Sequence, residues 1–392
     1  MRLTGTTAMG IRLPIISRGD DLVTIVCENV LAVTDKQPLA ANDIVAVTEA
    51  IVAKAEGNYA KVSDIAADVS AKFGGSGANS EIGLVYPGLS RNRFLNILKG
   101  IAAGAAKVHI LLSYPHDEVG NPVMDIDLLD EVNDKLGGKM VTAKEFQAAA
   151  GKYKHKFTGT DYVELYENVA DNIEIHFSND PRDILKFTKN VLVAEVHKRF
   201  ITKERLLKAG AEKVFTLSDI LNTSVNGSGF NAKYGVLGSN LSTDDSLKLF
   251  PNESQKFVEA VQARLQEKTG VAPEVMVYGD GAFKDPVCGI WELMDPVVSP
   301  GYTKRLGEQP AEIKMKLVAD TVFGDLSGDE KRKAITQMIK EKGAGAVSYS
   351  EGTTPRVYAD LVGSLCDLMS GSGDKGTPVI LVRGYFDDYS VE

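Results

Sequence analysis

The sequence predicts an α/β fold, because segments patterned as buried strands alternate with segments patterned as helices. Residues 43–47 form a short apolar run that leads into a helical stretch ending at Gly57. A second unit occurs in reverse order, since Ser90 can cap a helix and the strand-like run 107–115 follows it. The length of 392 residues favours two domains, or one domain with a large insertion. The same pattern is also compatible with an α+β fold.

The middle of the chain continues this alternation. The run 172–177 alternates as a strand does, and Pro181 opens a long, largely helical stretch through Ala209. Residues 212–221 are predicted to form another short strand and turn. The segment 223–231 is polar and rich in glycine, which makes it a boundary or a hinge.

The last third of the chain is predicted to add further sheet strands. Residues 254–270 carry one apolar face and indicate a helix that Asn252 or Ser254 can cap and Gly270 can close. The strand 274–278 runs directly into an acidic turn, and open α/β sheets hold their ligands at such strand ends. Near the C-terminus, 379–385 is another buried strand.

Charge and composition exclude several classes of protein. The net charge is −9 and acidic and basic residues are mixed, so no basic stripe could neutralise a phosphate backbone and no nucleic-acid partner is expected. No stretch approaches the roughly 18 apolar residues that span a bilayer, so no membrane segment is expected. The three cysteines lie far apart without a CxxC pair, which favours a reducing compartment and a cytoplasmic protein.

The glycine-rich stretch 370–378 (SGSGDKGTP) is a candidate phosphate site. Small side chains and exposed amides can wrap a phosphate, and Lys375 adds a positive charge. A mobile surface loop is the alternative for such a composition. The GxGxxG spacing found here precedes a strand and does not open a helix, so a dinucleotide site of the NAD type is not indicated.

Other polar residues are candidates for a site and also for structural roles. Lys54 lies near the end of the first helix, where the helix dipole stabilises a cation. Asp280 and Asp285 could hold Mg²⁺ or Mn²⁺, although acidic turn residues are more often structural. The turn formed by His116, Asp117 and Glu118 follows a buried strand and is a candidate for substrate contact.

Two other kinds of site are not indicated. Ser239 and Ser372 lack a visible base partner, so a serine-hydrolase triad has no support. The histidines show no zinc-type spacing, and each is expected to be a core or surface residue. They are His109, His116, His155, His176 and His197.

Several ordered blocks together resemble the coenzyme F-420 γ-glutamyl ligase family, also known as CofE-like proteins. The opening 10–16 (GIRLPII) with 19–21 (GDD) is similar to the family's GLPLI…GDD, and 43–57 is similar to its strand followed by an S/A-K-A-E-G block. The later blocks are 234–240 (YGVLGSN), similar to NAGIDxSN, 278–286, similar to TDTFGRP, and 370–378 with 382–384 (VRG).

The resemblance covers roughly 1–72 and 230–392. It implies a mixed-sheet ligase core formed by these two segments, with 73–229 as a large inserted α/β subdomain that shapes the site of the acceptor. It also implies a homodimer.

The resemblance implies a reaction as well. The family activates a substrate carboxylate with GTP and a divalent metal, and the amine of L-glutamate then attacks to form an amide. The acceptor would be coenzyme F-420 itself, a folate-type pterin or another small-molecule carboxylate. Phosphoryl transfer of this kind depends on positioned phosphates, a cation and metal.

Residue by residue, the resemblance implies that Lys54 and Asp280 are catalytic and that Mg²⁺ or Mn²⁺ lies on Asp280, with Asp285 as a further candidate ligand. The residues expected to contact the nucleotide come from four segments. They are Arg12, Leu13, Pro14, Ile15, Glu49, Ala50, Lys54, Asn240, Gly371, Ser372, Gly373, Asp374, Lys375 and Gly376.

Two positions depart from the family pattern. Leu237 stands where the family carries a metal-binding Asp, and Gly281 stands where it carries Thr. Because leucine cannot ligate a cation, Asp285, Asp244 or an acid of the insertion replaces it, or the chain uses one metal. The alternative function is a non-catalytic nucleotide- or metabolite-binding protein that has lost a metal site.

Overall fold

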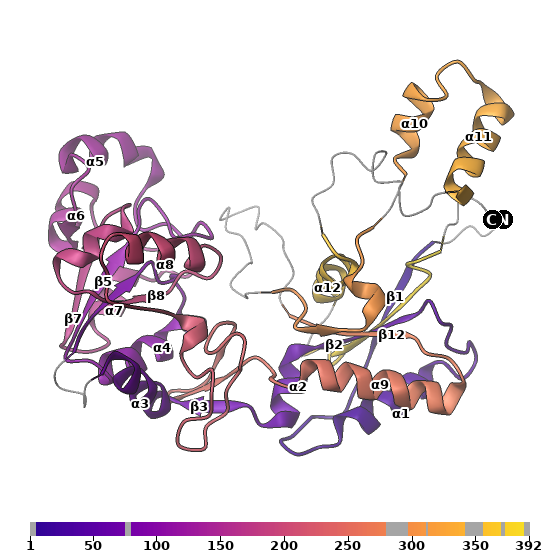
Figure 1. Cartoon of the computed structure of the whole chain (residues 1–392), viewed down its shortest axis with the longest axis horizontal. Coiled ribbons are helices and arrows are strands. Elements are labelled where there is room, and N and C mark those ends of the chain that lie inside the picture. Colours follow the sequence, from indigo (N-terminus) through magenta and orange to yellow (C-terminus); the bar gives the residue numbers. More distant parts are fainter. Residues whose placement is uncertain are drawn as a thin grey trace.

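The computed structural model describes residues 5–74, 80–279, 297–310, 313–341, 356–369 and 373–387. It confirms the α/β prediction, because helices alternate with strands and the strands form three sheets. Figure 1 shows a six-stranded sheet with its helices at one end of the molecule and a five-stranded sheet at the other.

The five-stranded sheet has the order β1 (Thr7–Ile11), β14 (Val379–Arg383), β2 (Ile44–Thr48), β12 (Glu274–Tyr278), β13 (Gly301–Tyr302). Strands β2 and β12 run parallel, and the other neighbours are antiparallel. Helices α1 (Leu22–Val33) and α9 (Ser254–Thr269) pack on one face, and α12 (Tyr358–Met369) packs on the other. This double cover explains why β2 is buried throughout and carries four apolar residues in succession.

Helix α2 (Glu49–Glu56) follows β2 without a loop, as the sequence predicts. It ends at Gly57, whose φ of 69° lies in the left-handed region that glycine adopts without steric penalty. The strands predicted at 274–278 and near the C-terminus are confirmed as β12 and β14.

The six-stranded sheet has the order β6 (Val141–Thr142), β7 (Ile173–Phe177), β5 (Lys107–Leu112), β4 (Glu81–Val85), β8 (Asn190–Val193), β9 (Lys213–Thr216). All its strands except β6 are parallel. The chain builds the sheet outward from β4 in one direction and then, from β8, in the other. This is a doubly wound arrangement, with its switch point between β4 and β8.

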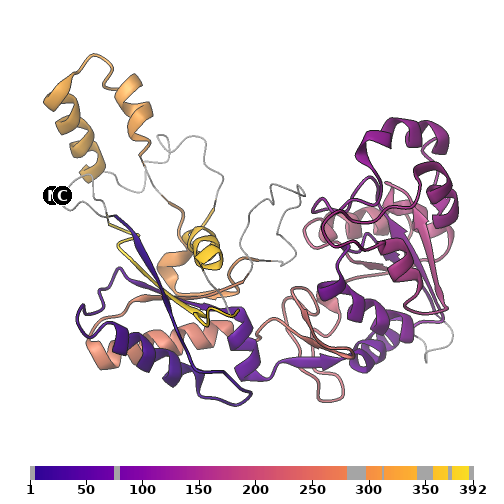
Figure 2. The same ribbon diagram turned by 180° about the vertical axis from the view of Figure 1, so that it is seen from behind.

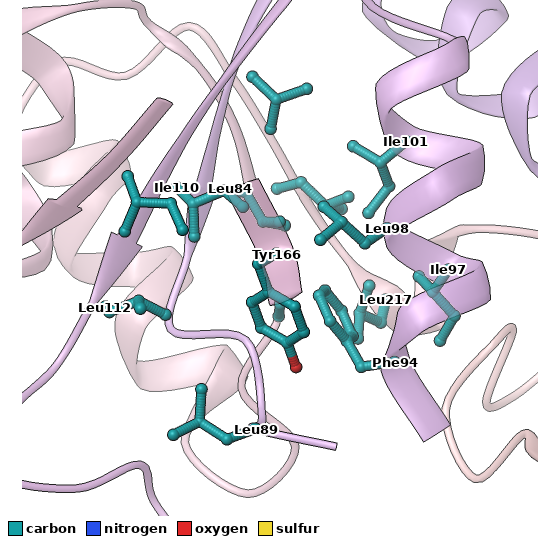
Figure 3. Close-up of a cluster of buried hydrophobic side chains, with 14 of the residues drawn as sticks. Leu84, Leu89, Phe94, Ile97, Leu98, Ile101, Ile110, Leu112, Tyr166 and Leu217 are labelled. Atoms are coloured by element: carbon teal, nitrogen blue, oxygen red, sulfur yellow. The ribbon is translucent and has the colours of Figure 1, made fainter. Parts of the chain in front are cut away.

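Helix α4 (Arg91–Ala103) provides the main packing surface for this sheet. The predicted cap is confirmed, because the Ser90 hydroxyl accepts a bond from the Arg93 amide at 3.2 Å. Figure 3 shows Phe94 and Leu98 of α4 facing Leu84 and the Tyr166 ring in a shared apolar cluster. The other helices of this region are α5 (Leu129–Leu136), α6 (Ala143–Ala150), α7 (Tyr162–Glu167), α8 (Arg199–Lys208), η1 (Ile126–Leu128) and η3 (Leu217–Asp219).

A small antiparallel sheet lies between the two larger ones. Its order is β10 (Asn240–Thr243), β11 (Ser246–Lys248), β3 (Tyr59–Lys61). Strand β3 carries the chain from α2 into α3 (Val62–Phe73), which packs closely on α4. This contact requires Gly100, because a Cβ there would lie 2.6 Å from Ile65.

The prediction of a largely helical stretch from Pro181 to Ala209 is wrong. A 3-10 helix, η2 (Pro181–Lys186), is followed by the buried strand β8 and only then by α8. Strand β8 is covered on both faces, so its sequence has no alternation. Periodicity alone cannot distinguish such a short apolar run from a helical segment.

The predicted capping of α9 is also wrong. Neither Asn252 nor Ser254 caps this helix. The Glu56 carboxylate instead accepts bonds from the amides of Asn252 at 2.9 Å and Glu253 at 3.1 Å. Burial raises the pKa of Glu56. The partner lies almost 200 residues away in sequence, so local pattern could not reveal it.

Helices α10 (Met315–Thr321) and α11 (Gly328–Glu341) form a hairpin that stands away from the five-stranded sheet in both views (Figures 1 and 2). The 3-10 helix η4 (Lys304–Gly307) precedes them. Across the described ranges, none of the helices combines the length and apolar character needed to cross a bilayer.

Candidate functional site

A cavity of about 370 Å³ lies at one edge of the five-stranded sheet, and its size is typical of a small-molecule site. Four separate segments line it: the stretch after β1, helix α2, the small sheet and the loop before β14. The lining residues are Leu13, Pro14, Ile15, Ile16, Ala50, Ile51, Lys54, Tyr59, Lys248, Gly373, Gly376 and Pro378.

Strand pairing explains why these segments meet. Ile11 at the end of β1 pairs with Val379 at the start of the antiparallel β14, so the segments beyond them lie side by side. Strand β14 also neighbours β2, which leads into α2. The amide of Thr48 donates to the carbonyl of Pro378 at 2.9 Å and fixes the glycine loop beside the start of α2.

The loop before β14 contributes backbone groups to the cavity. Gly376 has a φ of 63° and its amide bonds to the carbonyl of Gly373 at 3.0 Å, which closes a turn. A side chain at Gly376 would be strained in this conformation. Asp374 and Lys375 between them are exposed and are absent from the cavity lining.

Two lysines line the cavity, and the charge of one of them is balanced by a carboxylate. Lys54 is exposed and lines it from α2. Lys248 lines it from β11, and its ammonium donates to both carboxylate oxygens of Glu49 at 2.7 Å. Glu49 is the first residue of α2, so it also interacts with the positive end of the helix dipole. The charge of Lys54 and the loop amides favour an anionic ligand, whereas Glu49 already occupies the N-terminus of α2.

The small sheet extends this surface toward Asn240. Asn240 pairs with Lys248, and Lys248 pairs with Tyr59, so the three residues share one row of the sheet. Cross-strand partners point to the same face, which places Asn240 next to a cavity-lining residue. Burial, and then the charge of Glu49, raise the pKa of Tyr59.

The structure thus brings together most of the predicted nucleotide-binding segments. Leu13, Pro14, Ile15, Ala50, Lys54, Gly373 and Gly376 line one cavity. Glu49 and Asn240 contact or pair with Lys248 beside it. Arg12 is exposed and does not line the cavity. Gly371, Ser372, Asp280 and Asp285 lie outside the described residues.

The strand end that precedes Asp280 is well placed relative to this cavity. Tyr278 pairs with Thr48 in the parallel strands β12 and β2, so both strands end side by side where α2 begins. Leu237, which the sequence comparison predicts to stand where a metal ligand is expected, is buried in the apolar cluster with Val236. Asp244 is exposed at the far end of the β10–β11 hairpin, where its carbonyl accepts a bond from Lys99.

The predicted substrate turn lies at the carboxyl end of β5. Asp117 is buried and accepts bonds from the amides of Leu89, Val119 and Asn121 and from the Asn121 side chain. Glu118 accepts bonds from the amides of Val196 and His197. These carboxylates join the loops that follow β4, β5 and β8 around the switch point.

His116 has a different environment. It lines a cavity of about 230 Å³ together with His155 and Lys156. Its Nδ1 lies 2.7 Å from the carbonyl of Asp117. In the turn 116–118, two carboxylates therefore accept hydrogen bonds from backbone amides, and one imidazole lines the second cavity.

Sequence reasoning missed Tyr59 and Lys248 as lining residues. No local motif marks Lys248, because its position depends on the pairing of β11 with β3, almost 190 residues apart in the chain. The alternation Ser246-Leu247-Lys248, with Leu247 buried, is a weak strand signal that precedes the helix at 254.

Comparison with known protein families agrees with the resemblance of the sequence blocks. The family model described as F420-0:Gamma-glutamyl ligase matches residues 10–384, which includes the six-stranded sheet and nearly the whole chain. A comparison with curated proteins finds no match. Membership implies a γ-glutamyl ligase acting on small-molecule substrates. With its cavity built from the segments that carry the family blocks, the chain belongs to the F420-0:gamma-glutamyl ligase family.

Proposed function

We propose that the protein is a GTP-dependent γ-glutamyl ligase that joins L-glutamate to a small-molecule carboxylate through an acyl-phosphate. The observation that carries the proposal is the shared cavity. Segments 13–16, 50–54 and 373–378 line it together with Lys248, and each contains residues that the sequence predicts to contact a nucleotide. The charges there suit a triphosphate.

In this proposal, an oxygen of the acceptor carboxylate attacks the γ-phosphorus, and GDP leaves. The glutamate amine then attacks the acyl carbon, inorganic phosphate leaves, and the amine loses a proton. Lys54 and the amides of the loop at 373–376 hold the phosphate oxygens and stabilise charge that develops during phosphoryl transfer. Lys248 holds Glu49 at the start of α2.

A bound Mg²⁺ or Mn²⁺ would neutralise charge on the transferring phosphate. We propose Asp280 and Asp285 as its ligands, since they follow β12 in the chain and β12 ends beside Glu49. For the acceptor we propose the inserted region, where His116 and Lys156 border the second cavity. The proposal of a cytoplasmic homodimer rests on the family resemblance and on the cysteine pattern.

The test is phosphate release from GTP by the purified full chain, with Mn²⁺, L-glutamate and a panel of acceptors that includes coenzyme F-420 and folate-type pterins. We expect release that requires metal, acceptor and glutamate together. Hydroxylamine should trap the acyl-phosphate when glutamate is omitted. Replacement of GTP by ATP tests whether the enzyme requires a guanine nucleotide.

Variants locate the activity in the cavity. Lys54→Met should lower kcat by about 100-fold, the usual effect of losing one group that stabilises transition-state charge. Lys208→Met, at an exposed lysine of α8, is the matched control and should retain full activity. Nucleotide binding without turnover across the panel would support the non-catalytic alternative, which the buried Leu237 favours. Equal activity in both variants would refute the placement of the site.

A further inference from the structure

Two buried histidines and a glutamate meet on one face of the six-stranded sheet. His109 on β5 pairs with Glu174 on the parallel strand β7, and His176 follows two residues later. Because side chains alternate between the faces of a strand, all three point to the same side. One ligand atom of each lies within 4.8 Å of the other two.

The two imidazoles have nitrogens without partners. His109 is 3% exposed and His176 is 2% exposed, yet Nδ1 of His109 and Nε2 of His176 make no hydrogen bond. Buried polar atoms are normally bonded, so two unsatisfied nitrogens in one place need an explanation. The Phe187 ring stacks on the imidazoles of His109 and His176, with centroid distances of 4.4 Å and 4.3 Å, and so covers both of them.

Both free nitrogens face the same carboxylate. Nδ1 of His109 lies 3.6 Å from Oε2 of Glu174, and Nε2 of His176 lies 3.9 Å from Oε1. A tetrahedral zinc ion with bonds of about 2.0–2.1 Å holds its ligand atoms about 3.4 Å apart. Small side-chain adjustments therefore suffice to place all three around one ion.

We propose that His109, Glu174 and His176 form a site for Zn²⁺ or a similar divalent transition metal, separate from the nucleotide cavity. Two imidazoles and one carboxylate suit such metals, whereas Mg²⁺ prefers oxygen ligands throughout. The Glu174 side chain is 42% exposed. The fourth coordination position thus opens toward solvent and can take water or a small anionic ligand.

Two neighbouring side chains act on this cluster in opposite directions. Oε2 of Glu81 lies 3.6 Å from Nε2 of His109 and can accept its proton, which leaves the lone pair of Nδ1 for the metal. The ammonium of Lys107, 2.7 Å from Glu174, competes with a cation for this carboxylate.

The experiment uses the full chain, freed of metal with a chelator and titrated with Zn²⁺ or Co²⁺ in the absence of nucleotide. We expect one equivalent bound by elemental analysis and visible d–d absorption for tetrahedral Co²⁺. His176→Asn and Glu174→Gln should weaken binding by about 100-fold or more, and Glu81→Gln by about 10-fold. Lys107→Met should strengthen binding, because it removes the competing cation.

Controls separate this site from others. His155→Asn replaces an equally buried histidine with an unpartnered Nε2 outside the cluster, and should bind metal as the unaltered chain does. Asp280→Asn should also retain binding. Glu174→Gln at a half-exposed position keeps the shape of the side chain, so it remains informative if the histidine variants fail to fold. Undiminished binding by Glu174→Gln, or no stoichiometric binding by the unaltered chain, overturns the proposal.

Discussion

Glu195 is a buried carboxylate at the carboxyl end of β8, next to the switch point of the six-stranded sheet. The Thr202 hydroxyl donates to it. Burial, with a smaller contribution from the charge of Glu118, raises the pKa of Glu195 despite opposing effects of that hydrogen bond and of nearby Lys198 and Arg205. The folded state is therefore less stable when this carboxylate is ionised than when it is protonated.

The sign of the pH dependence follows from linkage. In the unfolded chain a glutamate ionises near pH 4.3, whereas folded Glu195 keeps its proton to a higher pH. The folded state therefore binds more protons between the two values, and stability falls as pH rises through that window. Glu195→Gln should raise the midpoint of urea unfolding at pH 7.5 and have little effect near pH 4.

The matched control is Glu204→Gln on α8. Glu204 is exposed, and Lys208 lowers its pKa, so its replacement should not stabilise the protein at pH 7.5. A lower midpoint for Glu195→Gln at pH 7.5 would mean that the ionised carboxylate is stabilised by its surroundings, contrary to this prediction.

At the same scale, the sequence predicted residues in local motifs and missed those placed by distant pairing. Lys54 and the glycine loop were identifiable because short segments carry them. Lys248 and Glu56 act on partners brought close only by the fold. His109 and His176 lie on adjacent strands without zinc-type spacing, so their proximity depends on the sheet register.

At the scale of elements, the packing of the turn at 234–240 depends on Gly235. Gly235 has a φ of 55°, and a Cβ there would lie 2.7 Å from the carbonyl oxygens of Leu217 and Ser218, and closer still to that of Ile220. All three atoms belong to the backbone, so no side chain can move aside. This close approach holds the family block 234–240 against η3.

Gly235→Ala should therefore be strongly destabilising. The left-handed conformation alone costs an alanine about 1–2 kcal/mol, and overpacking adds about 1–3 kcal/mol. Gly227→Ala provides the control, because Gly227 also has a positive φ of 79° but a Cβ at that position would meet no atom within 4 Å. Urea unfolding of both variants measures the difference, and equal losses would contradict the steric argument.

The elements differ in how well sequence predicted them. Helices with one exposed face, such as α4 and α9, and strands followed by glycine or polar turns, such as β12, show their periodicity directly. Strand β8 does not, because both its faces are buried and it lies between 3-10 and α-helical segments. The start of α9 shows the same limit, since Glu56 of α2 binds the backbone amides of the two residues that precede it.

At the scale of the whole molecule, the fully buried residues of the apolar clusters separate along the chain, while the partly buried Val297 packs against the largest cluster from outside its range. The largest apolar cluster runs from Ala60 to Leu249 and includes Ile65 and Val69 of α3 together with Leu237 and Leu247. The buried residues in the two clusters of the five-stranded sheet lie either at or before Val52 or at or after Phe257. Segments on both sides of 73–229 thus pack with the six-stranded sheet.

We propose residues 58–251 as the unit that folds independently, wider than the predicted subdomain 73–229. The ends of this unit lie together, because Tyr59 pairs with Lys248, as is common for an inserted domain. The Asn58 side chain donates to the carbonyls of Phe230 and Phe250 and accepts from the amide of Phe230, which joins the entry and exit segments.

A fragment of residues 58–251 should consequently unfold in one cooperative urea transition, followed by circular dichroism. A fragment of 73–229 should lack such a transition, because it loses α3 and the small sheet that cover the core beside α4. Removing α3 by truncation leaves Gly100 and the buried face of α4 open to water, and exposed apolar area on this scale costs several kcal/mol. If 73–229 unfolds as cooperatively as 58–251, then α3 and the strands β3, β10 and β11 contribute little to this core. In that case residues 73–229 are the independently folding unit.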